Sequence, residues 1–243
     1  MTYLLVGAVG LVLGLAAHDL AIQSLDDETK LRPFTGMCRG CRQARGWSRL
    51  VCPRCGGNAG RELIVAATSA SVAVGFVHTV GFHPELVAYL AFLALTTALV
   101  VTDLEEFRIV DRLNLPGSLV AALILTGAAA ISGEWPALLR GLGGAAAYFA
   151  GSSLLFVLVR GQGFGAGDVK LAPQLGLFTA FLGWGVLGWA VFATAMIGGV
   201  LALALVLTGA AGRKTELPYG PPMVLGAWTA IVMVGVGAIP IPT

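Results

Sequence analysis

Eight long apolar stretches run through the chain, and they constrain its fold more than any other feature. A helix that crosses a membrane needs about 20 mostly apolar residues. The chain is 57% hydrophobic and only 12% charged, whereas soluble domains carry about 25% charged residues. We therefore predict an all-α polytopic membrane protein with about eight transmembrane helices. The predicted spans cover about residues 3–23, 63–81, 86–102, 117–132, 137–159, 171–187, 188–210 and 221–240.

The first apolar stretch lacks the basic start and the small-residue cleavage site of a secretory signal, so we expect a retained helix. His18 and Asp19, near its inner end, are expected to reach the membrane interface. One polar segment follows at about 24–62. The sequence thus predicts three parts, which are a first helix at 1–23, a small cytoplasmic domain at 24–62, and a seven-helix membrane core at 63–243.

The basic residues predict an orientation. If the amino terminus faces outward, the inner loops hold fourteen of the fifteen lysines and arginines, and only Arg140 lies outside. Basic residues favour the cytoplasmic side of a membrane. We therefore expect the amino terminus outside and the polar segment in the cytoplasm.

The polar segment holds all the cysteines, in two CxxC pairs separated by ten residues: Cys38, Cys41, Cys52 and Cys55. Two such pairs supply four thiolates to a tetrahedral zinc ion, and a closed site of this kind is structural. A reducing cytoplasm disfavours disulfides. The alternatives are four free thiols in a loose loop, or a nucleic-acid-binding knuckle built on nearby arginines and Trp47. Because topology and anionic lipid already account for the arginines, we expect no nucleic-acid partner.

Two aspartates stand at the ends of apolar stretches. Asp168 lies in the glycine-rich segment Gly161–Leu171, and Asp103 ends the third stretch. A carboxylate among apolar helices is costly, so its default interpretation is functional. Glu105, Glu106 and Asp111 are expected to be solvated, and Pro116 is expected to start the next helix.

Two carboxylates a few ångströms apart cannot both be ionised, so they share one proton. Such a pair activates water against a peptide bond, which predicts an aspartic protease. Lys170 is expected either to act on this site or to anchor the inner loop. Two other classes stay open: a transporter or proton channel that uses the same carboxylates, and a non-catalytic assembly protein. The sequence has no HExxH motif of a zinc protease.

The segment Gly163–Leu171 resembles the GxGxGDxKL signature of prepilin peptidases, the type IV leader peptidases among the GxGD intramembrane aspartyl proteases. Asp103, followed six residues later by Ile109, resembles the earlier aspartate motif of that family. Pro218, Tyr219, Gly220 and Pro221 are similar to its PFGP element. The two CxxC pairs after the first helix also belong to the pattern.

The resemblance implies that Asp103 and Asp168 are the catalytic pair of a peptidase in the bacterial inner membrane. The members of the family remove the basic leader of type IV prepilins or pseudopilins at the cytoplasmic face, after a glycine. Many also N-methylate the new amino terminus, which makes S-adenosylmethionine a second candidate cofactor beside zinc. The expected active-site loop residues are Gly163, Gly165, Gly167, Lys170, Pro218, Tyr219, Gly220 and Pro221.

Overall fold

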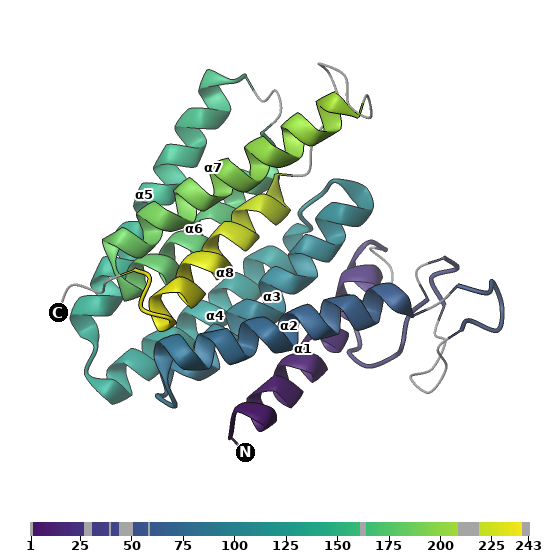
Figure 1. Cartoon of the computed structure of the whole chain (residues 1–243), viewed down its shortest axis with the longest axis horizontal. Helices are drawn as coiled ribbons and strands as arrows, with labels where there is room; N and C mark the ends of the chain where they lie inside the picture. Colours follow the sequence, from purple (N-terminus) through teal and green to yellow (C-terminus); the bar gives the residue numbers. More distant parts are fainter. Residues whose placement is uncertain are drawn as a thin grey trace.

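The computed structural model describes residues 2–26, 31–38, 40–43, 51–57, 59–160, 164–208 and 219–239. Eight α-helices and no β-strand occur in this part of the chain (Figure 1). The helices are α1 (Thr2–Ser24), α2 (Gly60–Val80), α3 (Glu85–Glu106), α4 (Asp111–Ser132), α5 (Trp135–Leu158), α6 (Ala166–Leu182), α7 (Trp184–Leu207) and α8 (Gly220–Gly235).

Each predicted span corresponds to one helix, and the prediction of an all-α, multi-pass membrane protein is confirmed. Six of the helices, α1 to α5 and α7, are long and apolar enough to cross a membrane. The remaining two are shorter, with 17 residues in α6 and 16 in α8. The predicted boundary between the sixth and seventh spans was several residues too late, because the chain breaks at Gly183 in an extended conformation.

The expectation that Pro116 starts the fourth helix was wrong, because α4 begins at Asp111 and holds Pro116 inside it. The preceding helix α3 ends where Phe107 adopts a left-handed conformation with φ 52°. Helix resumes after Val110, whose carbonyl accepts hydrogen bonds from the N–H groups of Leu113 and Asn114. The turn between α3 and α4 is therefore much tighter than the proline suggested.

The helices pack in pairs along the chain, α1 with α2, α3 with α4, α5 with α6, and α7 with α8. Small residues bring α5 and α6 together, since a Cβ at Gly176 would lie 2.4 Å from the carbonyl oxygen of Gly144. An aromatic core joins other helices: the Tyr89 hydroxyl donates a hydrogen bond of 2.7 Å to the carbonyl of Phe178. Shape complementarity of this kind drives association in lipid, where helices gain little from hydrophobic burial.

Arg140, in α5, caps the end of α6. Its guanidinium donates hydrogen bonds to the carbonyl oxygens of Ala180, at 2.8 Å, and of Phe181. The last carbonyls of a helix have no partner within the helix and carry partial negative charge. The arginine therefore satisfies a helix end that would otherwise be costly to place among apolar helices.

The last turns of α1 fasten the polar segment that follows. Asp19 is 2% exposed and accepts hydrogen bonds of 2.8 Å from the N–H groups of Gly36 and Met37. The side-chain amide of Gln23 donates to the Arg32 carbonyl and accepts from the Arg32 N–H, each at 2.7 Å. His18 is also 2% exposed. Both side chains are therefore buried by protein, and the expectation that they reach the membrane interface stays a prediction.

Candidate functional site

Asp103 lies in the last turn of α3 and is 5% exposed. The left-handed Phe107 ends the helix at this point, and its N–H donates to the Asp103 carbonyl at 2.9 Å. Among the described residues, Oδ2 of the Asp103 carboxyl has no hydrogen-bond partner. A buried carboxyl oxygen left in this way costs free energy. Asp103 therefore has an unused capacity for a hydrogen bond at a buried position.

Asp168 lies in the first turn of α6 and is 6% exposed. Its Oδ2 accepts a hydrogen bond of 2.8 Å from the N–H of Gly165, the residue that caps the helix. The amino-terminal end of a helix favours negative charge. This aspartate is thus held in place by its own helix start, and it is part of a helix rather than of a loop.

The two carboxyl groups face one region from opposite kinds of helix end. The two carboxyl groups interact electrostatically. The residues around them, Ile109, Gly167 and Gly220, are closely packed. A Cβ at Gly220 would lie 2.7 Å from Oδ2 of Asp103 and 3.5 Å from Cδ1 of Ile109. A Cβ at Gly167, next to Asp168, would lie 3.1 Å from Cβ of Ile109. Ile109 therefore packs between the two aspartate motifs, and the glycines at positions 167 and 220 leave the room it needs.

The structure also places the remaining residues of the predicted site. Tyr219 stacks edge-on against Phe164, with ring centroids 5.3 Å apart. Pro221 is buried in the first turn of α8, where the lack of an N–H costs nothing. Gly163 and Pro218 lie outside the described residues.

Lys170 points to a different partner. Its Nζ lies 2.6 Å from Oδ2 of Asp111, and both side chains are about half exposed, at 46% and 50%. The pair joins the first turn of α4 to the second turn of α6 at the surface. Asp111 was expected to be solvated, and its exposure agrees with that expectation.

The four cysteines form one cluster. Their Sγ atoms lie within 4.8 Å of one another. The Sγ atoms of Cys38 and Cys55 are 3.4 Å apart, and those of Cys41 and Cys52 are 3.7 Å apart. Thiolates on a tetrahedral zinc ion, with Zn–S bonds of about 2.3 Å, lie about 3.8 Å apart. The cluster can hold a metal ion, and all four thiols are free of disulfides.

Two similar backbone loops build the cluster. In the first, the N–H of Arg42 donates to the carbonyl of Cys38 at 2.7 Å; in the second, the N–H of Gly56 donates to that of Cys52 at 2.9 Å. Arg42 and Gly56 both have positive φ, 51° and 70°. Backbone N–H groups of Arg54 and Cys55 lower the pKa of the Cys52 thiol to about 6, whereas the hydrogen bond with Cys38 and burial raise that of Cys55 to about 11, so without a metal the thiolate is favoured at Cys52.

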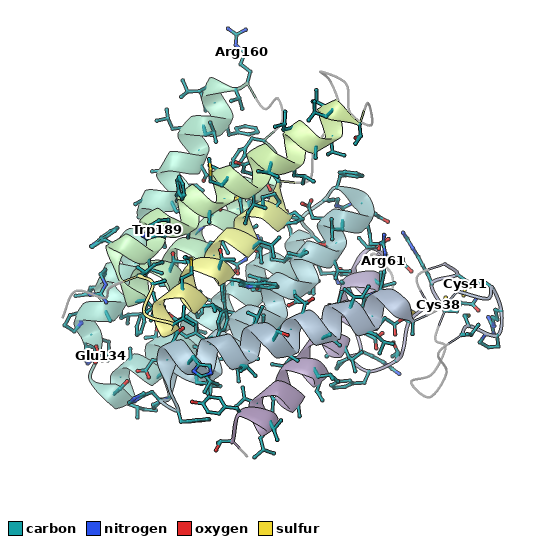
Figure 2. All side chains as sticks on the ribbon, viewed as in Figure 1. Cys38, Cys41, Arg61, Glu134, Arg160 and Trp189 are labelled. Atoms are coloured by element: carbon teal, nitrogen blue, oxygen red, sulfur yellow. The ribbon has the colours of Figure 1, made fainter. Side chains whose placement is uncertain are left out.

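One ion pair attaches this cluster to α3, the helix that carries Asp103, and a second attaches the start of α2 to the same helix. Arg42 pairs with Glu106, and Nη1 of Arg61 lies 2.7 Å from Oε1 of Glu105. Figure 2 shows Cys38, Cys41 and Arg61 on the opposite side of the molecule from Glu134. Glu106, which is exposed, thus contacts the cysteine segment, whereas Glu105 is half-buried and contacts the start of α2.

Sequence reasoning missed several residues that support the site. Asp19 and Gln23 were not assigned to the cysteine segment, although their spacing of four places them on one helix face beside it. Tyr148, in α5, interacts electrostatically with Asp168 and was not noticed. No local sequence pattern predicts this role for Tyr148, because α5 and α6 come together only through their packing.

Residues 90–207, which include both aspartates, match the model of the type IV leader peptidase family. Three relatives are named prepilin leader peptidase/N-methyltransferase. The protein of Bacillus subtilis is 30% identical over 166 residues, which cover 68% of this chain and 62% of the relative. For Stutzerimonas stutzeri the identity is 35% over 147 residues, 58% of this chain and 49% of the relative. For Aeromonas hydrophila the identity is 29% over 203 residues, which cover 81% of this chain and 62% of the relative.

The chain therefore spans about half to three fifths of the length of these relatives. No solved structure shows a significant match. The family matches the one that the residues themselves resemble, so the expected family is confirmed.

Proposed function

The chain belongs to the type IV leader peptidase family through residues 90–207, and from this premise we propose that it is a membrane aspartic endopeptidase. Its substrates are type IV prepilins or pseudopilins, from which it removes the leader peptide by cleaving after a glycine. Asp103 and Asp168 are the catalytic pair.

One observation carries this proposal: two buried aspartates from remote helices lie near enough to interact electrostatically, and Ile109 packs against both Gly167 and Gly220 beside them. A carboxyl oxygen of Asp103 has no partner among the described residues, so it is available to a water molecule or a peptide carbonyl. Asp168 is fixed by the start of α6. Such an arrangement provides a rigid pair with hydrogen-bonding capacity left for a substrate.

The proposed reaction uses the pair as a unit. The ionised carboxylate takes a proton from water, whose oxygen forms a bond to the carbonyl carbon of the scissile peptide. The protonated carboxyl donates a hydrogen bond to the carbonyl oxygen. The C–N bond then breaks as the leaving amine takes a proton, and the pair returns to its shared-proton state.

The substrate must approach this pair from the membrane. We place the amino terminus of the enzyme outside and both aspartates at the cytoplasmic face of the bacterial inner membrane, because the basic residues predict that orientation. The basic leader then stays in the aqueous phase, whereas the apolar pilin helix lies among the helices of the enzyme.

We assign a structural zinc ion to the four cysteines. Four thiolates with no open position would hold the ion in a closed site, and a bound zinc would stabilise residues 31–57 rather than supply chemistry. A Cβ at Gly57 would lie 3.3 Å from Sγ of Cys38 and 3.4 Å from that of Cys55. Gly57 therefore leaves the space around the thiolates that a metal requires.

N-methylation is a second candidate activity, because the names of the relatives include it. A cavity of about 490 Å³ lies beside the cysteines and is lined by His18, Arg61 and Glu105. Its mixture of positive and negative groups fits the charged amino-acid part of S-adenosylmethionine. Incubation with labelled S-adenosylmethionine and a cleaved pilin tests this activity, and product without label rejects it.

The test of the peptidase is cleavage by the purified full chain in detergent. The substrate is a synthetic peptide with a basic leader, a glycine and an apolar helix, and mass spectrometry identifies the fragments. We expect one cut after the glycine, and no cut with Asp103→Ala. A transporter, a channel or an assembly protein leaves the peptide intact at every enzyme concentration, and that result would overturn the proposal.

A further inference from the structure

An apolar pocket shares Phe164 and Tyr219 with the surroundings of the proposed site, and nothing in the proposed chemistry uses it. Its volume is about 390 Å³. Side chains of α5, α7 and α8 line it together with Phe164; the lining includes Tyr148, Gly151, Leu155, Thr194 and Tyr219. Leu155 and Val191, also in the lining, are 41% and 44% exposed. Leu155 of α5 and Val191 of α7 thus bring one side of the pocket to the surface of the bundle.

Two residues of the pocket lining, Phe164 and Tyr219, are chain neighbours of residues that contact the aspartates. Phe164 directly precedes Gly165, whose N–H binds Asp168. Tyr219 directly precedes Gly220, whose Cα faces Asp103. The rings of Phe164 and Tyr219 pack edge-on, so one wall of the pocket is joined through the backbone to both carboxyl positions. The side chains of Tyr148 and Tyr219 also interact electrostatically with Asp168.

We propose that this pocket binds the apolar side chains of the first helical turn after the scissile bond, and that its walls determine which substrates are cleaved. This inference rests on the proposed peptidase function. A bond held between the aspartates has a basic leader on one side and an apolar helix on the other. A charged leader side chain would lose its hydration in this pocket, whereas an apolar side chain gains by leaving water.

The size of the pocket agrees with that occupant. An apolar cavity of about 150 Å³ is enough for a benzene-sized group. A pocket of about 390 Å³ has room for more than one large side chain from a single helical turn. Seating these side chains would also fix the position of the preceding peptide bond against the carboxyl pair, which raises the rate by orientation.

Gly151 offers a way to fill the pocket without disturbing the fold. A Cβ at this position meets no other atom within 4 Å, although the residue belongs to the pocket lining. Ala147 lies one helical turn earlier in α5 and also lines the pocket. Gly151→Leu and Ala147→Leu are therefore two filling variants. Gly127→Leu in α4 is the matched control, because its Cβ also meets nothing within 4 Å and it is not part of the lining.

The experiment measures kcat/KM of the full chain for two substrates that differ only in the first turn after the bond, one rich in leucine and one with alanines. The wild type is expected to prefer the leucine substrate. Each filling variant lowers kcat/KM for that substrate by at least about tenfold, the effect of lost pocket volume in apolar recognition, and leaves the alanine substrate nearly unchanged. The control variant cleaves both substrates like the wild type.

Two outcomes overturn the inference. One is a wild type that cleaves both substrates equally well; the other is a filling variant that lowers both rates by the same factor or leaves both unchanged. If a filling variant instead changes only the lipid that copurifies, the pocket holds an acyl chain and the inference also fails. Cleavage of neither substrate by the wild type is a different result, because it rejects the peptidase function itself.

Discussion

The cysteine cluster and the aspartate site are each built from two short motifs, yet the motifs meet in different ways. The cysteines come from two backbone loops only ten residues apart, and each loop fixes its own thiols with backbone hydrogen bonds. Asp103 and Asp168 belong to separate helices, and Gly220 of a third helix packs against Asp103. The cysteine geometry is therefore local, whereas the aspartate geometry depends on the packing of the whole core.

This difference predicts which property a substitution changes first in each region. A change in the cysteine loops should alter metal content and local stability before it alters the chemistry. A change in the packing around the aspartates should alter the chemistry even when the bundle stays folded.

Replacement of either aspartate of the proposed catalytic pair should have the largest effect. Asp103→Asn and Asp168→Asn keep the size of the side chain but remove the shared proton, so cleavage should fall by at least about 10³-fold. The double variant should be no worse than either single one, because the pair acts as a unit. The measurement is the rate of peptide cleavage by mass spectrometry, with Glu134→Gln at the far end of the molecule as the control. Normal cleavage by either aspartate variant would reject the catalytic assignment.

Gly220→Ala should impair catalysis with little loss of folded protein. The new Cβ would lie 2.7 Å from Oδ2 of Asp103, so the carboxyl must shift, and a displacement of about 1 Å costs on the order of 10²-fold in rate. Kinetics and thermal unfolding of the same preparation separate the two effects, and Gly127→Ala is the matched control. An unfolding midpoint that falls while activity per folded molecule stays normal would contradict this geometry.

Cysteine variants should show the reverse order of effects. Cys38→Ser or Cys52→Ser removes a buried thiolate, so bound zinc should be lost and the unfolding midpoint should fall by about 2–4 °C for each kcal/mol of stability lost. Cleavage per folded molecule should fall far less than in the aspartate variants. Elemental analysis measures the zinc. Stoichiometric zinc retained after all four cysteines are replaced contradicts the site.

The surface pair should have the smallest effect. Asp111→Asn removes the partner of Lys170, but both side chains are about half exposed, and such pairs contribute at most about 1 kcal/mol. Cleavage and stability should stay close to those of the wild type. A large loss of activity in Asp111→Asn would show that the position of the Lys170 ammonium matters for the reaction, and would return Lys170 to the active site.

Much of the fold could be predicted because lipid imposes strong patterns. Apolar length alone marked each of the helices, and the spacing of Cys38, Cys41, Cys52 and Cys55 predicted a four-thiol cluster. Both signals are local, since they depend on residues within one helix or one loop. The glycine-rich segment around Asp168 was also visible, although its placement in the first turn of α6 was not.

The parts that could not be predicted depend on long-range packing. Pro116 suggested a helix start, but the left-handed Phe107 had already turned the chain. Asp19 was expected at the membrane interface. Its two N–H partners, Gly36 and Met37, come from the segment that folds back after α1. The apolar pocket, with Tyr148 in its lining, forms where α5, α7 and α8 come together. No single stretch of sequence predicts that arrangement. That the two aspartates meet was an inference from chemistry and family resemblance, and no periodicity required it.

Arg140 is the one exception to the predicted distribution of basic residues, and its contacts give it a role that the other basic residues do not have. It was counted as the single basic residue on the outer side, but its guanidinium is bound to the carbonyls that end α6. A cation held at the negative pole of a helix is electrically compensated before it reaches the headgroups. During insertion, such a residue should therefore exert little pull toward the cytoplasm once α5 and α6 have paired. Removing it would loosen that helix pair without changing which way the protein sits in the bilayer.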